Sequence, residues 1–90
     1  MSPYRHIKEV TKLMQLFGAS DLDIVDTFMK LSPDPFHSPG MISLYTGIGV
    51  EQVVEVFKEN EEFIRIDGFV WTTKEKLDSC KEVDNFEKLV

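Results

Sequence analysis

Three glutamates recur at every fourth position in the segment "GVEQVVEVFKEN". At about 3.6 residues per turn, Glu51, Glu55 and Glu59 share one side of a helix, opposite its valine and phenylalanine side chains. A carboxylate about 4 Å from a phosphate costs on the order of 1 kcal/mol even in water, so three would weaken nucleic-acid binding roughly a hundredfold. We therefore expect this helix to present a solvated or protein-binding face and not to enter DNA.

Few side chains of the types that catalyse reactions or bind metals are present. The histidines are His6 and His37 and the lone cysteine is Cys80, and their spacing matches no zinc pattern. The chain has no glycine-rich loop of the kind that cradles phosphate. Surface carboxylates are plentiful, but no pattern marks a buried pair with separated pKa values. We therefore expect no enzymatic activity, no metal and no cofactor.

Composition and charge set the class of protein. The 90 residues suit one domain, with a core at about 3–72 and a C-terminal helix or tail at 73–90. Ten Lys and Arg stand against sixteen Asp and Glu, a net charge of −6, whereas DNA-binding domains are usually basic. No apolar run is long enough to span a membrane and no secretory signal opens the chain. With one cysteine, these features favour an intracellular protein, cytoplasmic or, in a eukaryote, nuclear.

Apolar periodicity predicts four helices. The first begins at Ser2 and Pro3 and ends at Gly18, and the second begins at the cap Ser20. After a proline-rich loop, Ser38 and Pro39 begin a short third helix, and the segment "TGIG" turns into the fourth. The residues expected on the buried faces are Ile7, Val10, Met14 and Phe17 of the first helix, Leu22, Val25, Phe28 and Met29 of the second, and Val50, Val53, Val54 and Phe57 of the fourth.

The segment "EFIRIDGFVWTT" predicts a β-hairpin, because Asp67-Gly68 is a preferred two-residue turn between β-rich runs. That turn pairs Ile66 with Phe69 and Ile64 with Trp71 on one face, with Trp71 as a core anchor. The other face is expected to carry Phe63, Arg65, Val70 and Thr72. A capping-box pattern from Thr72 to Glu75 predicts a short helix after the hairpin.

The stretch from Ser38 to Thr72, which begins "SPGMISLYTGIGVEQVVEVFKENEEFIRIDGFVW", resembles a winged helix. In that family a short helix, a glycine-containing turn and a second helix precede a β-hairpin, the wing. The resemblance implies a mainly α, α+β winged helix-turn-helix fold: about four helices, a two-stranded wing and a short C-terminal helix or tail. Winged-helix domains with acidic faces resemble those that act as docking modules for other proteins.

We therefore expect a non-enzymatic adaptor or regulator that binds a protein, for example within a transcription or replication machine. The predicted partner-binding surface combines an apolar centre with a charged rim, and its residues are Glu55, Val56, Glu59, Phe63, Arg65 and Val70. The alternative is that the first or last helix covers the apolar members. A homodimer through this surface is a further hypothesis, in which the basic side of one first helix meets the acidic stripe of another copy.

Two other functions stay open. A DNA-binding transcriptional regulator could contact phosphates through two small basic groups, one on the first helix and one on and after the wing: Arg5, Lys8 and Lys12, then Arg65, Lys74 and Lys76. Nucleic acid is the less expected partner, because each group is within what a solvated surface shows by chance. An acidic decoy that blocks a basic nucleic-acid-binding site is the third hypothesis.

Overall fold

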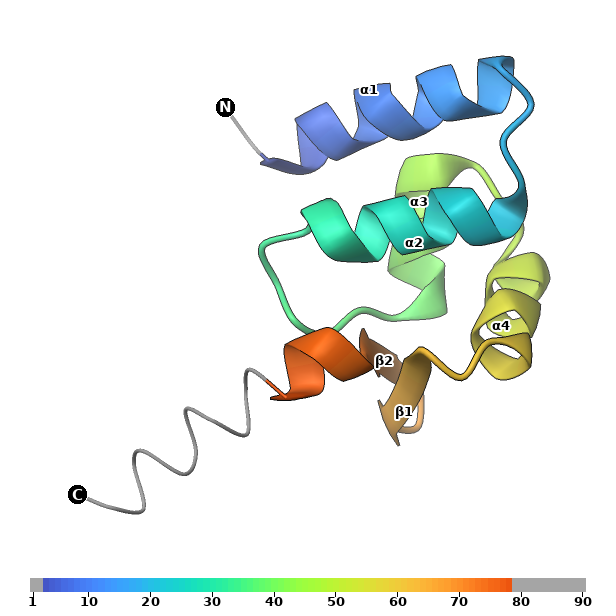
Figure 1. The fold of residues 1–90 in the computed structure, drawn as a ribbon. Helices are drawn as coiled ribbons and strands as arrows, with labels where there is room; N and C mark the ends of the chain where they lie inside the picture. The colour runs from blue at the N-terminus through green and yellow to red at the C-terminus, as the bar shows by residue number, and fades with distance from the viewer. Residues whose placement is uncertain (1–2, 79–90) are drawn as a thin grey trace.

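The computed structural model describes residues 3–78 of the chain (Figure 1). The mainly helical α+β fold predicted from the sequence is confirmed. In chain order the elements are α1 (Pro3–Leu16), α2 (Asp21–Leu31), α3 (Pro39–Thr46), α4 (Val50–Glu59), β1 (Phe63–Asp67) and β2 (Val70–Thr73), followed by a helical turn at 74–78. The predictions for Ser2 as a cap and for Cys80 lie outside the described residues.

The helices stack in layers above the hairpin in the view of Figure 1. Helix α1 forms the outermost layer, α2 lies in front of α3, and α4 flanks them at one end. Strands β1 and β2 form a two-stranded antiparallel sheet, which lies with the 74–78 turn on the side opposite α1. Helix α1 and the hairpin are thus at opposite ends of the fold.

Side-chain caps set two of the helix starts. The Ser20 hydroxyl accepts a hydrogen bond from the Asp23 amide and the Ser38 hydroxyl accepts one from the Met41 amide, both at 3.2 Å. Each cap satisfies a backbone donor that has no partner within its helix. Gly47 ends α3 in the left-handed conformation, with φ of 79°, which glycine adopts without steric cost. The predicted boundaries at these residues are confirmed.

The core lies between all four helices and the inner face of the hairpin. Its largest fully buried side chains include Ile7, Ile24, Phe28, Met29, Ile42 and Phe57. Two of the helix residues predicted to be buried are exposed. Phe17 follows the last residue of α1 and is 88% exposed, and Val50 at the start of α4 is 47% exposed. The buried face of α4 is instead Val53, Val56 and Phe57, because α2 packs along the side of α4 that carries Val56.

Thr11 fills a place that the sequence pattern did not assign to the core. Its side chain is fully buried one helical turn after Ile7, and its hydroxyl donates to the Ile7 carbonyl at 2.9 Å. This bond to the preceding turn satisfies the hydroxyl where no water reaches it. A polar residue can therefore occupy an inner helical position without an unpaired donor.

The hairpin forms, but its predicted register is wrong. Asp67 pairs with Val70 and Arg65 with Trp71, with an irregularity at Ile66, so the turn residues are Gly68 and Phe69. This slip by one residue exchanges the two faces of β1 relative to Trp71. Phe63 and Trp71 now share the inner face against Phe57, while Ile66 and Phe69 are exposed.

The helical turn at 74–78 begins one residue later than predicted. The Thr73 hydroxyl accepts a hydrogen bond from the Lys76 amide at 3.2 Å and therefore caps this turn. Thr72, the predicted cap, is fully buried and donates instead to the Pro35 carbonyl at 2.6 Å. Within residues 3–78, no helix is long and apolar enough to cross a membrane.

Candidate protein-binding surfaces

A groove of about 360 Å³ lies between the start of α2 and the outer side of α4. Val56 and Leu22 contribute its apolar floor, and carboxylates surround them. The lining residues are Asp21, Leu22, Gln52, Glu55, Val56, Glu59 and Asn60. We call this site the acidic groove. It brings together three of the six residues predicted to bind a partner, namely Glu55, Val56 and Glu59.

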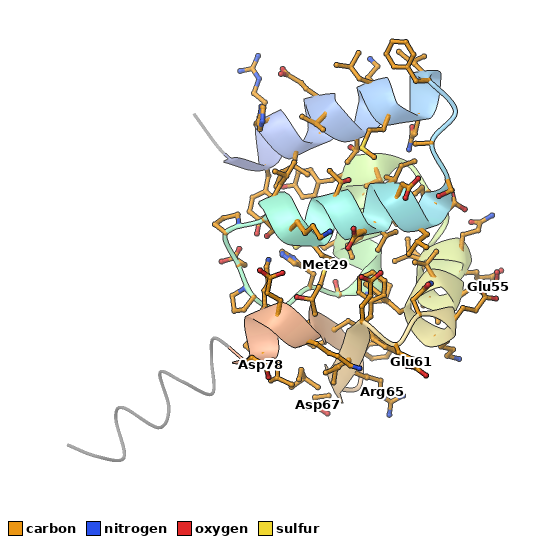
Figure 2. All side chains as sticks on the ribbon, in the orientation of Figure 1. Met29, Glu55, Glu61, Arg65, Asp67 and Asp78 are labelled. Atoms are coloured by element: carbon orange, nitrogen blue, oxygen red, sulfur yellow. The ribbon has the colours of Figure 1, made fainter. Side chains whose placement is uncertain are left out.

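The glutamates of α4 have no cationic partner within the described part of the chain. The ion pairs there are Arg5–Glu9, at 3.8 Å, and Lys30–Asp26, at 2.8 Å. Glu51, Glu55 and Glu59 are all exposed, and Figure 2 shows Glu55 directed outward from α4. The groove therefore offers uncompensated negative charge beside apolar surface, which favours a ligand carrying positive charge and an apolar group.

The apolar residues predicted to bind a partner do not form the expected exposed patch. Phe63 is 5% exposed and Val56 is 8% exposed, so both are core side chains at the surface's edge and not its exposed centre. The hairpin register explains this, since it turns Phe63 onto Phe57 with ring centroids 5.1 Å apart. Val70 is half-buried and Arg65 is exposed on β1 (Figure 2). Phe63 and Val56 are covered, but the residues seen against them belong to α4 and α2 and not to the first or last helix named in the alternative.

The residues considered for phosphate contacts fall into two separate groups. Arg5, Lys8 and Lys12 are exposed on α1, whereas Arg65 and Lys74 are exposed on and after the hairpin. Because α1 and the hairpin lie at opposite ends of the fold, these groups do not merge into one basic patch (Figure 1).

Lys76, the last of these basic residues, turns inward. Its ammonium group donates to the Ser32 and Asp34 carbonyls at 2.9 and 2.8 Å. Burial lowers the pKa of Lys76 from its usual value. These hydrogen bonds connect the 74–78 turn to the loop after α2. They occupy the ammonium group that the sequence pattern suggested for phosphate contacts.

A second groove lies between α1 and α3, with a volume of about 320 Å³. Its lining residues are Lys8, Lys12, Gln15, Leu44, Tyr45, Thr46 and Gly47, and we call it the lysine groove. The Gln15 amide donates to the Thr46 carbonyl and ties the two helix ends together. Leu44 is 76% exposed at this site. The sequence pattern identified Lys8 and Lys12 as exposed basic residues. It could not show that the packing of α3 on α1 places Leu44 beside them.

Ser32 and His37 form a buried pair at the junction of α2, the following loop and the hairpin. The Ser32 hydroxyl hydrogen-bonds to Nε2 of His37, and Tyr4 bonds to both Ser32 and the Asp34 carboxylate. The backbone of His37 exchanges two hydrogen bonds with Trp71, at 2.9 and 2.8 Å. By type this is a nucleophile and a base, but both side chains are buried and none of the grooves described above reaches them. The cluster holds the loop against the hairpin.

The environment of His37 disfavours its charged form. Burial, and secondarily the Lys76 ammonium group, lower the pKa of His37 from its usual value. Nδ1 of His37 is buried and has no hydrogen-bond partner among residues 3–78. The neutral tautomer that carries its proton on Nε2 leaves only an acceptor unpaired, whereas the imidazolium would bury an unpaired donor. Asp34 partly opposes the shift.

Among residues 3–78, no group of three or more His, Cys, Asp or Glu side chains is arranged to hold a metal ion. Comparison with known proteins gives no assignment: no family model matches the chain, and no curated protein or solved structure is significantly similar to it.

Proposed function

We propose that the chain is a winged-helix-like docking module that binds a basic, amphipathic segment of a partner protein in the acidic groove. The proposal includes no catalytic step. Helices α2, α3 and α4 followed by an antiparallel hairpin have the element order of a winged helix, in which α4 takes the place of the DNA-reading helix. The main support is that Glu55 and Glu59, which have no ion-pair partner among residues 3–78, lie beside the apolar floor of the acidic groove.

Charge argues for a protein ligand over DNA at this helix. Helix α4 carries three glutamates and one basic residue, Lys58. A phosphate backbone placed along it would meet repulsion from each carboxylate, since binding to DNA depends on replacing counterions by Lys and Arg. A lysine- or arginine-rich helix or loop would instead pair with those carboxylates, and such complementarity sets orientation and association rate.

The floor of the groove supplies the apolar part of the contact. Leu22 is half-buried, and Val56 is nearly covered, so a ligand side chain can contact both without entering the core. The polar groups of Gln52 and Asn60 lie at the same site. An apolar centre with a polar rim is the usual anatomy of a protein interface. A protein that blocks a basic nucleic-acid-binding site would use the same chemistry.

The test is a titration of a fluorescein-labelled helical peptide of lysine, alanine and leucine, followed by anisotropy at low salt. We expect saturable binding that Glu55→Lys with Glu59→Lys weakens about tenfold or more, because each reversal replaces attraction by repulsion. The same peptide with glutamate in place of lysine should not bind. The control Glu61→Lys with Asp67→Lys changes the net charge equally, outside the groove. Equal affinity for both charge-reversed variants would contradict the proposal.

A further inference from the structure

Helices α1 and α4 carry opposite charge on the same molecule. Helix α1 has three basic residues, Arg5, Lys8 and Lys12, against one acidic residue, while α4 has three acidic residues against one basic residue. Lys8 and Lys12 are exposed and take part in no ion pair within residues 3–78, as is true of Glu55 and Glu59. In a chain of net charge −6, the exposed side of α1 is thus a local exception.

We propose that the protein self-associates by a head-to-tail contact. In this contact, the residues lining the lysine groove of one copy, between α1 and α3, pack against the residues lining the acidic groove of a second copy. This inference rests on the proposed function, because the acidic groove is the same site. The other copy's α1 supplies the basic groups that enter it, and Leu44 of that copy's α3 supplies the apolar one. A second copy is a partner that is always present, at the concentration of the protein itself.

The spacing of the charges matches across this contact. Lys8 and Lys12 are four residues apart, as are Glu55 and Glu59, so each pair spans about 6 Å along its helix axis. Two helices lying side by side can therefore place each lysine opposite one glutamate. Both pairs border a groove, so the helices approach with their charges at the rim and their apolar side chains between them.

The apolar centre comes from both grooves. Leu44 is 76% exposed in the lysine groove. The acidic groove offers Leu22 and Val56 as a floor of limited area. Leu44 is the anchor that fits over this floor, while the lysines and glutamates fix the orientation. Exposed ion pairs contribute little energy each, so the association is weak and depends on salt.

The two grooves are different surfaces, which determines the kinds of assembly. A contact between unlike surfaces closes as a two-fold pair only when each copy makes it twice, and otherwise continues into a ring or chain. In every case one copy's lysine groove and another copy's acidic groove are used together. Removing either one therefore removes the assembly.

Sedimentation velocity over a concentration series tests the inference. The wild-type chain should shift to larger species as its concentration rises at about 0.05 M salt and return to monomer at about 1 M salt, where screening acts over about 3 Å. Lys8→Glu with Lys12→Glu should be monomeric, and so should Glu55→Lys with Glu59→Lys. A mixture of these two variants should associate again, because each reversed groove meets a reversed counterpart.

The control is Arg65→Glu with Lys74→Glu, which changes the net charge as the α1 variant does but lies at the other end of the fold. It should associate like the wild type. Circular dichroism should show all these variants folded, since every substituted side chain is exposed. A wild-type chain that stays monomeric, or a mixture that fails to associate, would overturn the inference.

The lysine peptide separates this result from the proposed function. The α1 variant keeps its acidic groove and should bind the peptide at least as tightly as the wild type, in which a second copy competes for that groove. Peptide binding by a monomeric wild-type chain would reject self-association and leave the docking function in place. Rescue in the mixed variants without peptide binding would support self-association while rejecting a lysine-rich segment as sufficient ligand.

Discussion

Trp71 of the hairpin stacks on Phe57 of α4, with ring centroids 4.8 Å apart and ring planes 15° from parallel. Aromatic pairs of this size contribute about 0.5–1.5 kcal/mol beyond the area they bury. The backbone of Trp71 also pairs with His37 in the loop after α2. This one residue thus joins α4, the hairpin and the α2–α3 connection, and it positions the helix that carries the acidic groove.

Replacing Trp71 by alanine is expected to cost about 3–5 kcal/mol of folding free energy, a large part of the roughly 5–15 kcal/mol typical of a domain. Phe69→Ala is the matched control, because Phe69 is an aromatic residue of the same hairpin that is 81% exposed. Its cost should be within about 0.5 kcal/mol. Urea unfolding monitored by circular dichroism gives both values. A wild-type midpoint for Trp71→Ala would show that the stack on Phe57 does not support the fold.

Phe63 and Val70, which the sequence pattern places on the same outer face of the hairpin, are expected to differ in how much stability is lost when each is replaced. Phe63→Ser should prevent stable folding, because it removes a ring that packs on Phe57 and buries a hydroxyl in its place. Val70→Ser, at a half-buried position, should cost about 1 kcal/mol. Guanidinium titrations compare the two variants. Equal, small costs would mean that Phe63 is not in the core.

Local sequence signals predicted the elements of this fold well. Ser20 and Ser38 cap their helices as expected, because a hydroxyl before a helix bonds to a backbone amide only three residues away. The hairpin register instead depended on contacts between residues that are distant in the sequence. Asp67-Gly68 favours a turn locally, but packing of both Phe63 and Trp71 on Phe57 requires the slip at Ile66, and that packing is a long-range effect.

The candidate site was predicted only in part for the same reason. Glu55 and Glu59 were found because helical spacing alone places them on one outer face. Val56 was assigned to the surface, because the sequence does not show that α2 lies along that side of α4. Asp21 and Leu22, which complete the acidic groove, come from a helix about thirty positions earlier in the chain. No local pattern connects them to α4.

Stability is expected to fall as the pH falls below about 6.5, the ordinary pKa of histidine. The folded state lowers the pKa of His37, so the unfolded chain takes up a proton first as the pH decreases. The stabilisation is fully present above the unfolded pKa and is lost as the pH falls toward the folded one. Urea midpoints from about pH 7.5 to about pH 5.5 measure this change.

His37→Gln is the control for that pH dependence. Glutamine can still donate a hydrogen bond toward Ser32 but has no proton to take up in this range. The variant should be less stable than the wild type near neutral pH and should lose less stability on acidification. Parallel pH profiles for the two proteins would assign the acid sensitivity to other groups.

Binding to random duplex DNA is expected to be weaker than the roughly 10⁻⁴–10⁻⁶ M typical of non-specific binding by DNA-binding proteins at physiological salt. The reason is the outer face of α4, with Glu51, Glu55 and Glu59 exposed, and the separation of the basic groups on α1 and the hairpin. Gel-shift titration at low salt provides the measurement. Glu55→Lys with Glu59→Lys should increase the affinity. Micromolar binding by the wild type with a steep salt dependence would favour a DNA-binding regulator.

Recognition of a basic protein segment by the outer side of α4 can be observed residue by residue with amide chemical-shift mapping. The ¹⁵N-labelled chain is titrated with the lysine, alanine and leucine peptide at a concentration and salt where it is monomeric. We expect the shifted amides to cluster around the acidic groove, at Leu22, Gln52, Glu55, Val56 and Asn60. Shifts centred on α1 or on the hairpin, or no shifts at saturating peptide, would contradict it.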